Sequence, residues 1–257
     1  MRTRSDSMKE NILLLTATIT PPLNAAQLQR VDPSIRLQDY AEAFEFYLKQ
    51  MKQGIISAIV FSDNSNSNLQ ILRDLTEKYN AANQVEFIVF EGLDYPPAYG
   101  RGYGEFKMVD YVMEHSTIIR NASPEANIWK ITGRYILENI ANVVRTKPAD
   151  THFYCNCRNI PIYWMDLYVL CWSAKFYEQH IKGMYLTLRA DNEFGGAEQG
   201  FRKKLESQTS SMRVVKRFTT VPLLHGYRGW DNKNYKEMGL KLLARRVALV
   251  VMPWLWI

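Results

Sequence analysis

Short apolar runs alternate with segments of helical periodicity in the first half of the chain, and this alternation is the feature that most constrains the fold. The runs cover residues 11–19, 55–61 and 85–90. Between them, residues 37–52 and 69–79 carry apolar side chains at helical spacing, and Asp32-Pro33 provides a helix start. Strands that alternate with helices through short connections form βαβ units. We therefore predict an α/β fold with a mostly parallel, twisted sheet flanked by helices.

The second half of the chain continues with further strands and helices, without an internal repeat. We expect strands at 128–135, 152–158 and 166–172, and helices at 108–119, 137–144 and 173–182, with another helix after Gly195-Gly196. No linker is long enough to separate two independent domains. We therefore expect one domain over residues 1–235, followed by a distinct segment at 236–257.

A glycine-rich stretch, Gly100–Lys107, stands immediately before an apolar-periodic segment. We expect it to be a loop in which Gly102 and Gly104 let the backbone approach a ligand, while Arg101 supplies positive charge. Such a loop suits a phosphate or diphosphate. Its spacing matches neither the P-loop nor the dinucleotide fingerprint, so a surface turn before a helix is the alternative.

Several polar segments follow the predicted strands directly. Thr16 to Thr18, Ser62 to Ser65 and the glycine-rich stretch all come after strand ends. In parallel sheets these ends lie on one edge, where ligands bind. The sequence therefore predicts a binding site at that edge.

Charge and cysteine content narrow the classes of protein. The net charge of +6 favours anionic partners without choosing among them. Cys155, Cys157 and Cys171 are an odd number without framework spacing, which argues for a reducing compartment. His152 and the first two cysteines lack the fourth ligand of a structural zinc site. The N-terminus does not resemble a signal peptide, and no apolar run reaches transmembrane length, so we expect a cytoplasmic protein.

The order of several motifs resembles bacterial GT-A-type glycosyltransferases, which have a Rossmann-like nucleotide-sugar fold and act in surface polysaccharide and lipopolysaccharide biosynthesis. The resemblance spans roughly residues 10–240 and is carried by residues 35–40, 59–65, 100–105, 130–135, 165–166, 173–177, 198 and 225–229. It implies a transferase that moves a sugar from a nucleotide-sugar donor to a glycan or lipid-linked acceptor. It also implies a donor half at about 10–148 and an acceptor half at about 149–235.

The same resemblance suggests roles for individual residues. Contacts to the base and ribose of the donor are expected from Thr16, Thr18, Asp63 and Asn64, and contacts to its diphosphate from Arg101, Gly102 and Gly104. GT-A enzymes usually carry Asp-x-Asp after the fourth strand to hold a divalent metal, but this chain has none. Lys130, Gly133 and Arg134 occupy that region, and a guanidinium suits phosphate oxygens. We therefore expect metal-independent transfer, with Mn²⁺ or Mg²⁺ not favoured as a cofactor.

Inverting transfer needs a base for the acceptor hydroxyl. The catalytic candidates are Asp166, first choice from its position, and Glu198, with Glu193 and Glu105 as further carboxylates. A helix-capping role for Asp166 and a solvated helix face for Glu198 are the alternatives. His225 and Arg228 are candidates for acceptor or phosphate contact, and a structural role for His225 is equally open.

The C-terminal segment combines basic and apolar residues at helical spacing and ends in tryptophans. Residues 235–251 predict a basic amphipathic helix, which is typical of a peripheral anchor on the anionic cytoplasmic face of the inner membrane. The alternative is a terminal helix packed on the protein's own core.

Two rival functions are a basic nucleic-acid-binding protein and another Rossmann-like transferase that uses a nucleotide or S-adenosylmethionine. The basic residues are dispersed and no RNA-binding signature is present, so we expect no nucleic-acid partner. A glycine fingerprint after the first strand, typical of the second rival, is also missing.

Overall fold

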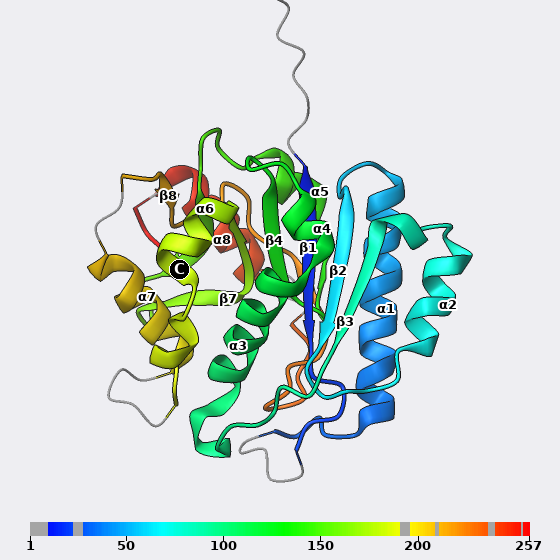
Figure 1. The fold of residues 1–257 in the computed structure, drawn as a ribbon. Coiled ribbons are helices and arrows are strands. Elements are labelled where there is room, and N and C mark those ends of the chain that lie inside the picture. Colours follow the sequence, from blue (N-terminus) through cyan, green and yellow to red (C-terminus); the bar gives the residue numbers. More distant parts are fainter. Residues whose placement is uncertain (1–9, 23–27, 191–195, 209–210, 236–239, 253) are drawn as a thin grey trace, which may run out of the picture.

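A seven-stranded sheet forms the centre of the computed structural model, which describes residues 10–22, 28–190, 196–208, 211–235, 240–252 and 254–257. The strand order is β3-β2-β1-β4-β7-β6-β8 (Figure 1). The strands are β1 (Asn11–Ala17), β2 (Ala58–Asp63), β3 (Val85–Val89), β4 (Asn127–Thr132), β6 (Phe153–Arg158), β7 (Trp164–Trp172) and β8 (Val214–Val215). Strands β1 to β4 run parallel, whereas β7 is antiparallel to β4 and β6. The predicted mostly parallel α/β class is confirmed.

Helices cover both faces of the sheet. Successive side chains of a strand point to opposite faces, so Leu13 and Leu15 of β1 join one core cluster and Ile12 and Leu14 the other. The first cluster packs against α1 (Pro33–Lys52), α2 (Gln70–Lys78) and α5 (Ile140–Arg145). The second packs against α3 (Gly100–His115), α4 (Thr117–Asn121), α6 (Ala174–Phe176) and α7 (Ala197–Ser207). This two-faced burial explains why β1 is a continuous apolar run.

Helix α1 begins as the sequence predicts. The Asp32 carboxylate accepts hydrogen bonds from the backbone N–H groups of Ser34 (2.8 Å) and Ile35 (3.3 Å), and Pro33 occupies the first helical position. The helix therefore starts four residues before its apolar periodicity. Its buried residues include Tyr40, which lies against the carboxyl edge of the sheet.

The glycine-rich stretch is not a loop, which corrects the expectation from sequence. Helix α3 begins at Gly100 itself, with φ +78° at that residue, and ends at His115. Other differences are smaller: β2 begins at Ala58 and β4 ends at Thr132. The expected helix at 137–144 begins only at Ile140, after the short strand β5, and the expected helix at 108–119 is divided between α3 and α4. The expected helix at 173–182 is α6 followed by a π-helical turn, η3 (Tyr177–Ile181). Ser173 caps α6 as predicted, accepting from the N–H of Phe176 at 3.3 Å.

A small second sheet and a terminal helix complete the described chain. Strand β5 (Ile136–Leu137) pairs with β9 (Leu224–His225) and brings residues 224–235 to the carboxyl edge. Helix α8 (Leu240–Val251) is the predicted C-terminal helix, while residues 236–239 of the expected range lie outside the described residues. In the part of the chain that is described, a search for membrane-spanning helices found none with the length and apolarity required.

Candidate functional site at the carboxyl edge of the sheet

The ends of β1 and β4 meet a carboxylate from α3. Thr16 and Thr132 are register partners in the parallel pair, and their hydroxyls donate to Glu105 Oε1 at 2.7 and 2.9 Å. The Nζ atom of Lys130 lies 2.5 Å from the same oxygen and donates to the Leu167 carbonyl at 2.7 Å. Three side chains from two strands therefore converge on one carboxylate oxygen of α3, which fixes the start of this helix against the strand ends.

Burial and charge act together on this carboxylate. Burial alone would raise the pKa of Glu105, but the Lys130 ammonium and the hydrogen bonds from Lys130, Thr16 and Thr132 outweigh it and hold the pKa below its usual value. Lys130 itself is fully buried. The charge of Glu198, on the first turn of α7, acts on Lys130 in the same direction as that of Glu105. Glu198 therefore belongs to the surroundings of this cluster.

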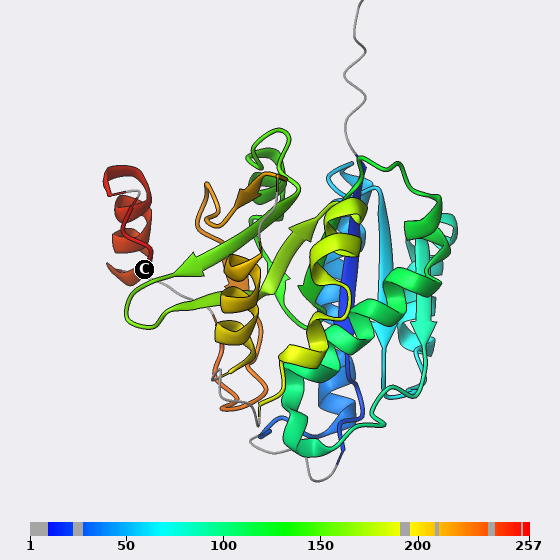
Figure 2. The ribbon, with the colours of Figure 1, turned by 60° about the vertical axis from the view of Figure 1, so that its left-hand side comes forward.

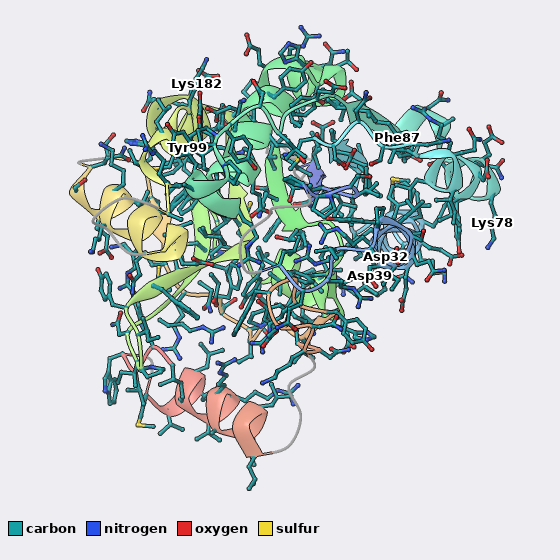
Figure 3. All side chains as sticks on the ribbon, turned by 90° about the horizontal axis from the view of Figure 1, so that it is seen from below. Asp32, Asp39, Lys78, Phe87, Tyr99 and Lys182 are labelled. Atoms are coloured by element: carbon teal, nitrogen blue, oxygen red, sulfur yellow. The ribbon has the colours of Figure 1, made fainter. Side chains whose placement is uncertain are left out.

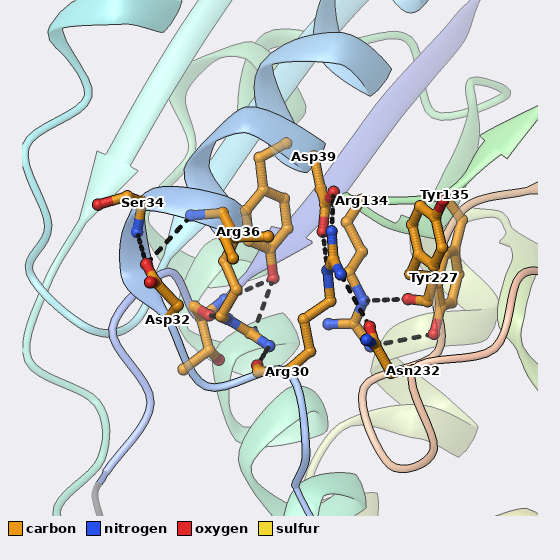
Figure 4. Close-up of polar contacts among 12 residues, drawn as sticks. Arg30, Asp32, Ser34, Arg36, Asp39, Arg134, Tyr135, Tyr227 and Asn232 are labelled. Carbon is orange, nitrogen blue, oxygen red and sulfur yellow. Dashed lines mark hydrogen bonds and ion pairs between the residues drawn. The ribbon is translucent and has the colours of Figure 1, made fainter.

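Three arginines, Arg30, Arg36 and Arg134, lie close together at this edge of the sheet (Figure 4). Arg36 of α1 is buried and donates to the Thr18 carbonyl at 2.9 Å and to the Arg30 carbonyl at 3.0 Å. Arg134, which follows β4, donates to the Tyr227 carbonyl at 3.1 Å and to the Tyr135 hydroxyl at 3.0 Å. Burial lowers the pKa of Arg36, and the charge of Arg134 lowers it further. The guanidinium groups therefore stand close enough to oppose one another electrostatically.

Arg30 is the member of this group that is held by a carboxylate. Its Nε and NH2 atoms lie 2.5 and 2.7 Å from the two oxygens of Asp39, and its guanidinium stacks 4.5 Å from the Tyr227 ring centroid. Asp39 is seen near Asp32, the residue that caps α1, in the view from below (Figure 3). Among the described residues, Arg36 and Arg134 bond to carbonyl and hydroxyl oxygens instead of carboxylates. This edge of the sheet therefore carries net positive charge.

The loop around Gly229 joins the two walls that the sequence proposes for a diphosphate site. A Cβ added at Gly229 would lie 3.0 Å from Arg134 NH2 and 3.6 Å from Arg101 NH1. The two guanidinium groups thus approach the same backbone position from α3 and from the end of β4. The Gly229 carbonyl also accepts from the N–H groups of Gln29 (2.9 Å) and Arg30 (3.2 Å), which closes the loop over this edge.

Gly102 and Gly104 of α3 and Gly133 after β4 are close-packed positions. A Cβ at Gly102 would lie 2.1 Å from the Cβ of Ala197, and one at Gly104 would lie 1.8 Å from the Tyr95 hydroxyl. A Cβ at Gly133 would lie 2.9 Å from the Thr16 carbonyl oxygen. Each glycine therefore has a packing reason, and contact with a donor stays a prediction for all three.

The polar residues that end β1 and β2 hold two loops together. The Thr18 hydroxyl donates to Asn64 Oδ1 at 2.7 Å. The Asp63 carboxylate accepts from the N–H groups of Ile19 and Ser67 at 2.9 Å each, and from the Ser65 hydroxyl at 2.8 Å. The predicted donor contacts of Thr18, Asp63 and Asn64 would therefore come in addition to these structural bonds.

The remaining predicted site residues fall into different surroundings. Asp166 is buried in β7, and its Oδ2 accepts from Asn156 Nδ2 (2.7 Å), Arg158 Nε (3.0 Å) and the Tyr168 hydroxyl (2.8 Å). A row of tyrosines connects Asp166 with Arg134. Tyr235 packs against Tyr168 and against Tyr135, with ring centroids 5.8 and 4.9 Å apart, and the Tyr135 hydroxyl accepts from Arg134. Asp166 thus lies at the far end of an aromatic row that starts beside Arg134.

The last three predicted site residues are His225 of β9, Arg228 in the loop after β9, and Glu193 before α7. Arg228 is bound through Nε and NH2 by Asp231, with the Nε contact at 2.9 Å. His225 Nδ1 lies 3.9 Å from a Glu138 oxygen and is half-buried. Glu193 lies outside the described residues. Within the residues that are described, no group of three or more His, Cys, Asp or Glu side chains has an arrangement suited to a metal ion.

Arg30 and Arg36 are site residues that sequence reasoning missed. A signal for Arg36 was present, because it stands four residues before Tyr40 on the apolar stripe of α1, where a cation requires buried partners. Arg30 had no such signal, since it precedes α1 and its contacts with Asp39 of that helix and with the distant Asn232 (2.8 Å) depend on the tertiary structure.

Comparisons with known proteins give structural likeness at low sequence identity. No family model matches the chain, and no curated protein matches it. Among solved structures, a protein from Desulfovibrio desulfuricans G20 assigned as a nucleotide-diphospho-sugar transferase is similar, with TM-score 0.47 and 12% identity over 96% of this chain and 99% of that one. A 4-diphosphocytidyl-2C-methyl-D-erythritol synthase gives TM-score 0.38 at 10% identity, covering 93% and 99%.

A third similar structure is a Bacillus anthracis protein assigned as a glucose-1-phosphate thymidylyltransferase in complex with sucrose, with TM-score 0.39 and 9% identity over 85% of this chain and 89% of that one. At these scores and identities, the α/β class of the present chain rests on its own strand order and connections.

Proposed function

We propose that this chain is a glycosyltransferase that moves a sugar from a nucleotide-sugar donor to a glycan or lipid-linked acceptor in the assembly of cell-surface polysaccharide. The observation that carries the proposal is the approach of Arg101 and Arg134 to one backbone position at the carboxyl edge of the sheet. Ligands of open α/β sheets bind at that edge. Guanidinium groups there match the oxygens of a diphosphate. The motif resemblance of residues 10–240 indicates that this diphosphate belongs to a nucleotide-sugar.

The reaction would begin with attack of an acceptor hydroxyl oxygen on the anomeric carbon. A new carbon–oxygen bond forms, the bond between that carbon and the diphosphate oxygen breaks, and the nucleoside diphosphate leaves with the bonding electrons. Arg101 and Arg134 would stabilise the charge that develops on this leaving group. Because they are permanent cations, we propose that transfer proceeds without Mn²⁺ or Mg²⁺.

The hydroxyl proton needs a carboxylate acceptor if the anomeric configuration inverts. Glu198 is the better placed of the two candidates, because it is exposed on the first turn of α7 and its charge reaches Lys130. Asp166 has its Oδ2 engaged by three side chains. We therefore propose Glu198 as the base and Asp166 as a residue that positions the acceptor half, at about 149–235, beside the donor half, at about 10–148.

A thermal-shift screen against UDP-, GDP- and CMP-sugars tests the proposal. A bound donor raises the free energy of unfolding by RT ln(1 + [L]/Kd), and the melting temperature rises with it, so one nucleotide class is expected to stabilise the chain. Transfer is then expected to persist in excess EDTA. Activity that vanishes in EDTA and returns with Mn²⁺ would contradict the metal-independent part alone. Salt-sensitive RNA binding without any nucleotide-sugar stabilisation would favour the nucleic-acid-binding rival instead.

A further inference from the structure

Helix α8 presents an apolar stripe to solvent. Leu240, Leu243, Val247 and Val250 repeat at alternating spacings of three and four residues, which places them on one side of the helix. Leu240 is 84% exposed and Val250 80%. Trp254 continues the same spacing beyond the helix and is 73% exposed. Large apolar side chains exposed together in this way mark an interaction site.

The opposite side of α8 packs on the protein itself. Ala248 is buried, and Leu249 and Arg245 line a cavity of about 30 Å³ together with Arg158 and Pro222. Just beyond the helix, the Trp256 carbonyl accepts from the N–H groups of Asn159 (2.8 Å) and Ile160 (3.1 Å). The orientation of the helix is therefore fixed by its inner side, and the stripe is left on the outer side.

A second apolar element lies next to α8. The turn between β6 and β7 exposes Ile160, Ile162 and Tyr163, and the bonds from residues 159 and 160 to Trp256 hold it beside the chain end. Figure 2 shows α8 and the tip of this hairpin side by side at the edge of the molecule. We call the combined region the C-terminal apolar surface: Leu240, Leu243, Val247, Val250, Val251, Trp254, Ile160, Ile162 and Tyr163.

The charge near the stripe favours an anionic partner. Residues 240–257 contain three cations, Lys241, Arg245 and Arg246, and no acidic residue, and Arg245 lies on the inner side of α8. Arg246 is exposed next to Val247. A second copy of the stripe would bring like charges together, whereas an anionic lipid headgroup layer complements them. Tryptophan at the rim of an apolar surface is typical of the membrane–water interface.

We propose that the C-terminal apolar surface docks the chain on an anionic lipid membrane. The stripe of α8 and the hairpin tip enter the interface as two contact points, and Arg246 remains at the level of the headgroups. Docking requires neither the arginine cluster nor the proposed transfer reaction. The docking surface lies on the β6–β7 side of the molecule, where Arg158 lines the cavity under α8 and also bonds to Asp166.

Cosedimentation of the full chain with lipid vesicles tests this proposal. Vesicles of phosphatidylcholine with roughly one-third phosphatidylglycerol should bind the protein at low salt, and pure phosphatidylcholine vesicles should bind it far less. The double variant Leu243→Glu, Val250→Glu should weaken the partition constant by about tenfold or more, because it places charge on the buried side of the contact. Raising the salt concentration should weaken it as well.

Matched controls use exposed apolar residues elsewhere. Ile71→Glu on α2 and Leu186→Glu on η4 (Met184–Thr187) make the same change at residues that are 42% and 60% exposed, and both should bind vesicles like the wild type. Urea denaturation checks that all variants fold. Absent vesicle binding, or equal binding by the double variant, would overturn the proposal. So would a wild-type dimer in light scattering that the double variant abolishes, because that result assigns the surface to a second copy.

The outcome is separable from that of the proposed function. Arg134→Gln should lose stabilisation by nucleotide-sugars and keep vesicle binding, whereas the Leu243→Glu, Val250→Glu variant should show the reverse pattern. A chain that fails the nucleotide screen and still binds vesicles leaves the membrane surface in place.

Discussion

Glu105 Oε1 lies 2.5 Å from Lys130 Nζ, and the lysine side chain is completely buried. The ion pair joins the first turns of α3 to the end of β4, and Arg134 of the proposed donor site follows the same strand. A buried charge that loses its partner is costly, commonly about 3–5 kcal/mol. The pair is therefore the point at which stability and the candidate site are most closely linked.

Removing either partner should destabilise the fold, and removing both should cost less than the sum. We expect Lys130→Met to lower the free energy of unfolding by about 3–5 kcal/mol, with a large part recovered in Lys130→Met, Glu105→Gln. Urea denaturation of the four proteins in a double-mutant cycle measures the coupling. The exposed pair Lys78–Glu45, at 3.0 Å, is the control, and its coupling should be about 1 kcal/mol or less. Additive losses at the buried pair would contradict the prediction.

The lowered pKa of Glu105 predicts a loss of stability in acid. A carboxyl group whose pKa is lower in the folded state than the usual value of about 4.5 contributes stability above that value, and the contribution is lost as the pH falls through the folded pKa. The free energy of unfolding of the wild type should therefore fall more steeply below about pH 4.5 than that of Glu105→Gln. Urea denaturation at a series of pH values measures the difference, and parallel curves would show that Glu105 is not responsible.

Gly102 offers a test of packing against ligand contact. Alanine normally stabilises a helix relative to glycine by about 0.5–1 kcal/mol, but a Cβ here would lie 2.1 Å from the Cβ of Ala197. Gly102→Ala should therefore destabilise the protein by about 1–3 kcal/mol. Adding Ala197→Gly removes the clashing atom and should restore most of the stability, as measured by thermal unfolding. A Gly102→Ala protein of normal stability that fails to bind nucleotide-sugars would instead support the phosphate-loop interpretation.

Locally determined features were predictable from sequence, and features set by distant contacts were not. The run at β1 and the Asp32-Pro33 start of α1 follow from a few adjacent residues, and both were predicted correctly. The glycines before Met108 predicted a loop because glycine weakens helices. They pack against Tyr95, in the loop before α3, and Ala197, on α7, and no local pattern reveals these contacts. The antiparallel direction of β7 was likewise invisible, since an apolar run does not reveal strand direction.

The candidate site shows the same division. Arg134 was identified because it stands where the resemblance to GT-A enzymes expects acids, and Arg101 because it is a cation in the glycine-rich stretch. Their meeting at Gly229 depends on the β9 loop, whose path no local pattern specifies. Arg30 joins them through its contact with Asp39, the stacking on Tyr227 and the bond from its backbone N–H to the Gly229 carbonyl.

Arg134 should be required for donor binding. Arg134→Gln removes a charged contact to the proposed diphosphate. It should raise the dissociation constant of the donor by roughly 30-fold or more, equivalent to about 2 kcal/mol. Arg134→Lys should restore little, because a lysine cannot reproduce a bidentate contact. Thermal-shift titration with the best donor of the screen provides the readout. Arg145→Gln, an equal loss of charge at an exposed residue of α5, should bind as the wild type does, and an unchanged titration for Arg134→Gln would remove the central part of the proposed function.

Asp166 and Glu198 should separate into a structural and a chemical role. Glu198→Gln keeps the shape of an exposed side chain and should leave unfolding unchanged while lowering kcat by about 10²–10⁴-fold, as expected for a lost general base. Asp166→Asn leaves Arg158 without its carboxylate and should lower the free energy of unfolding by about 2–4 kcal/mol. Measuring kcat and urea denaturation for both variants, with Glu77→Gln on α2 as the neutral control, distinguishes the roles. If Asp166→Asn folds normally and loses turnover while Glu198→Gln retains it, the base is Asp166, and the aromatic row through Tyr168 and Tyr235 leads from the donor site to the acceptor.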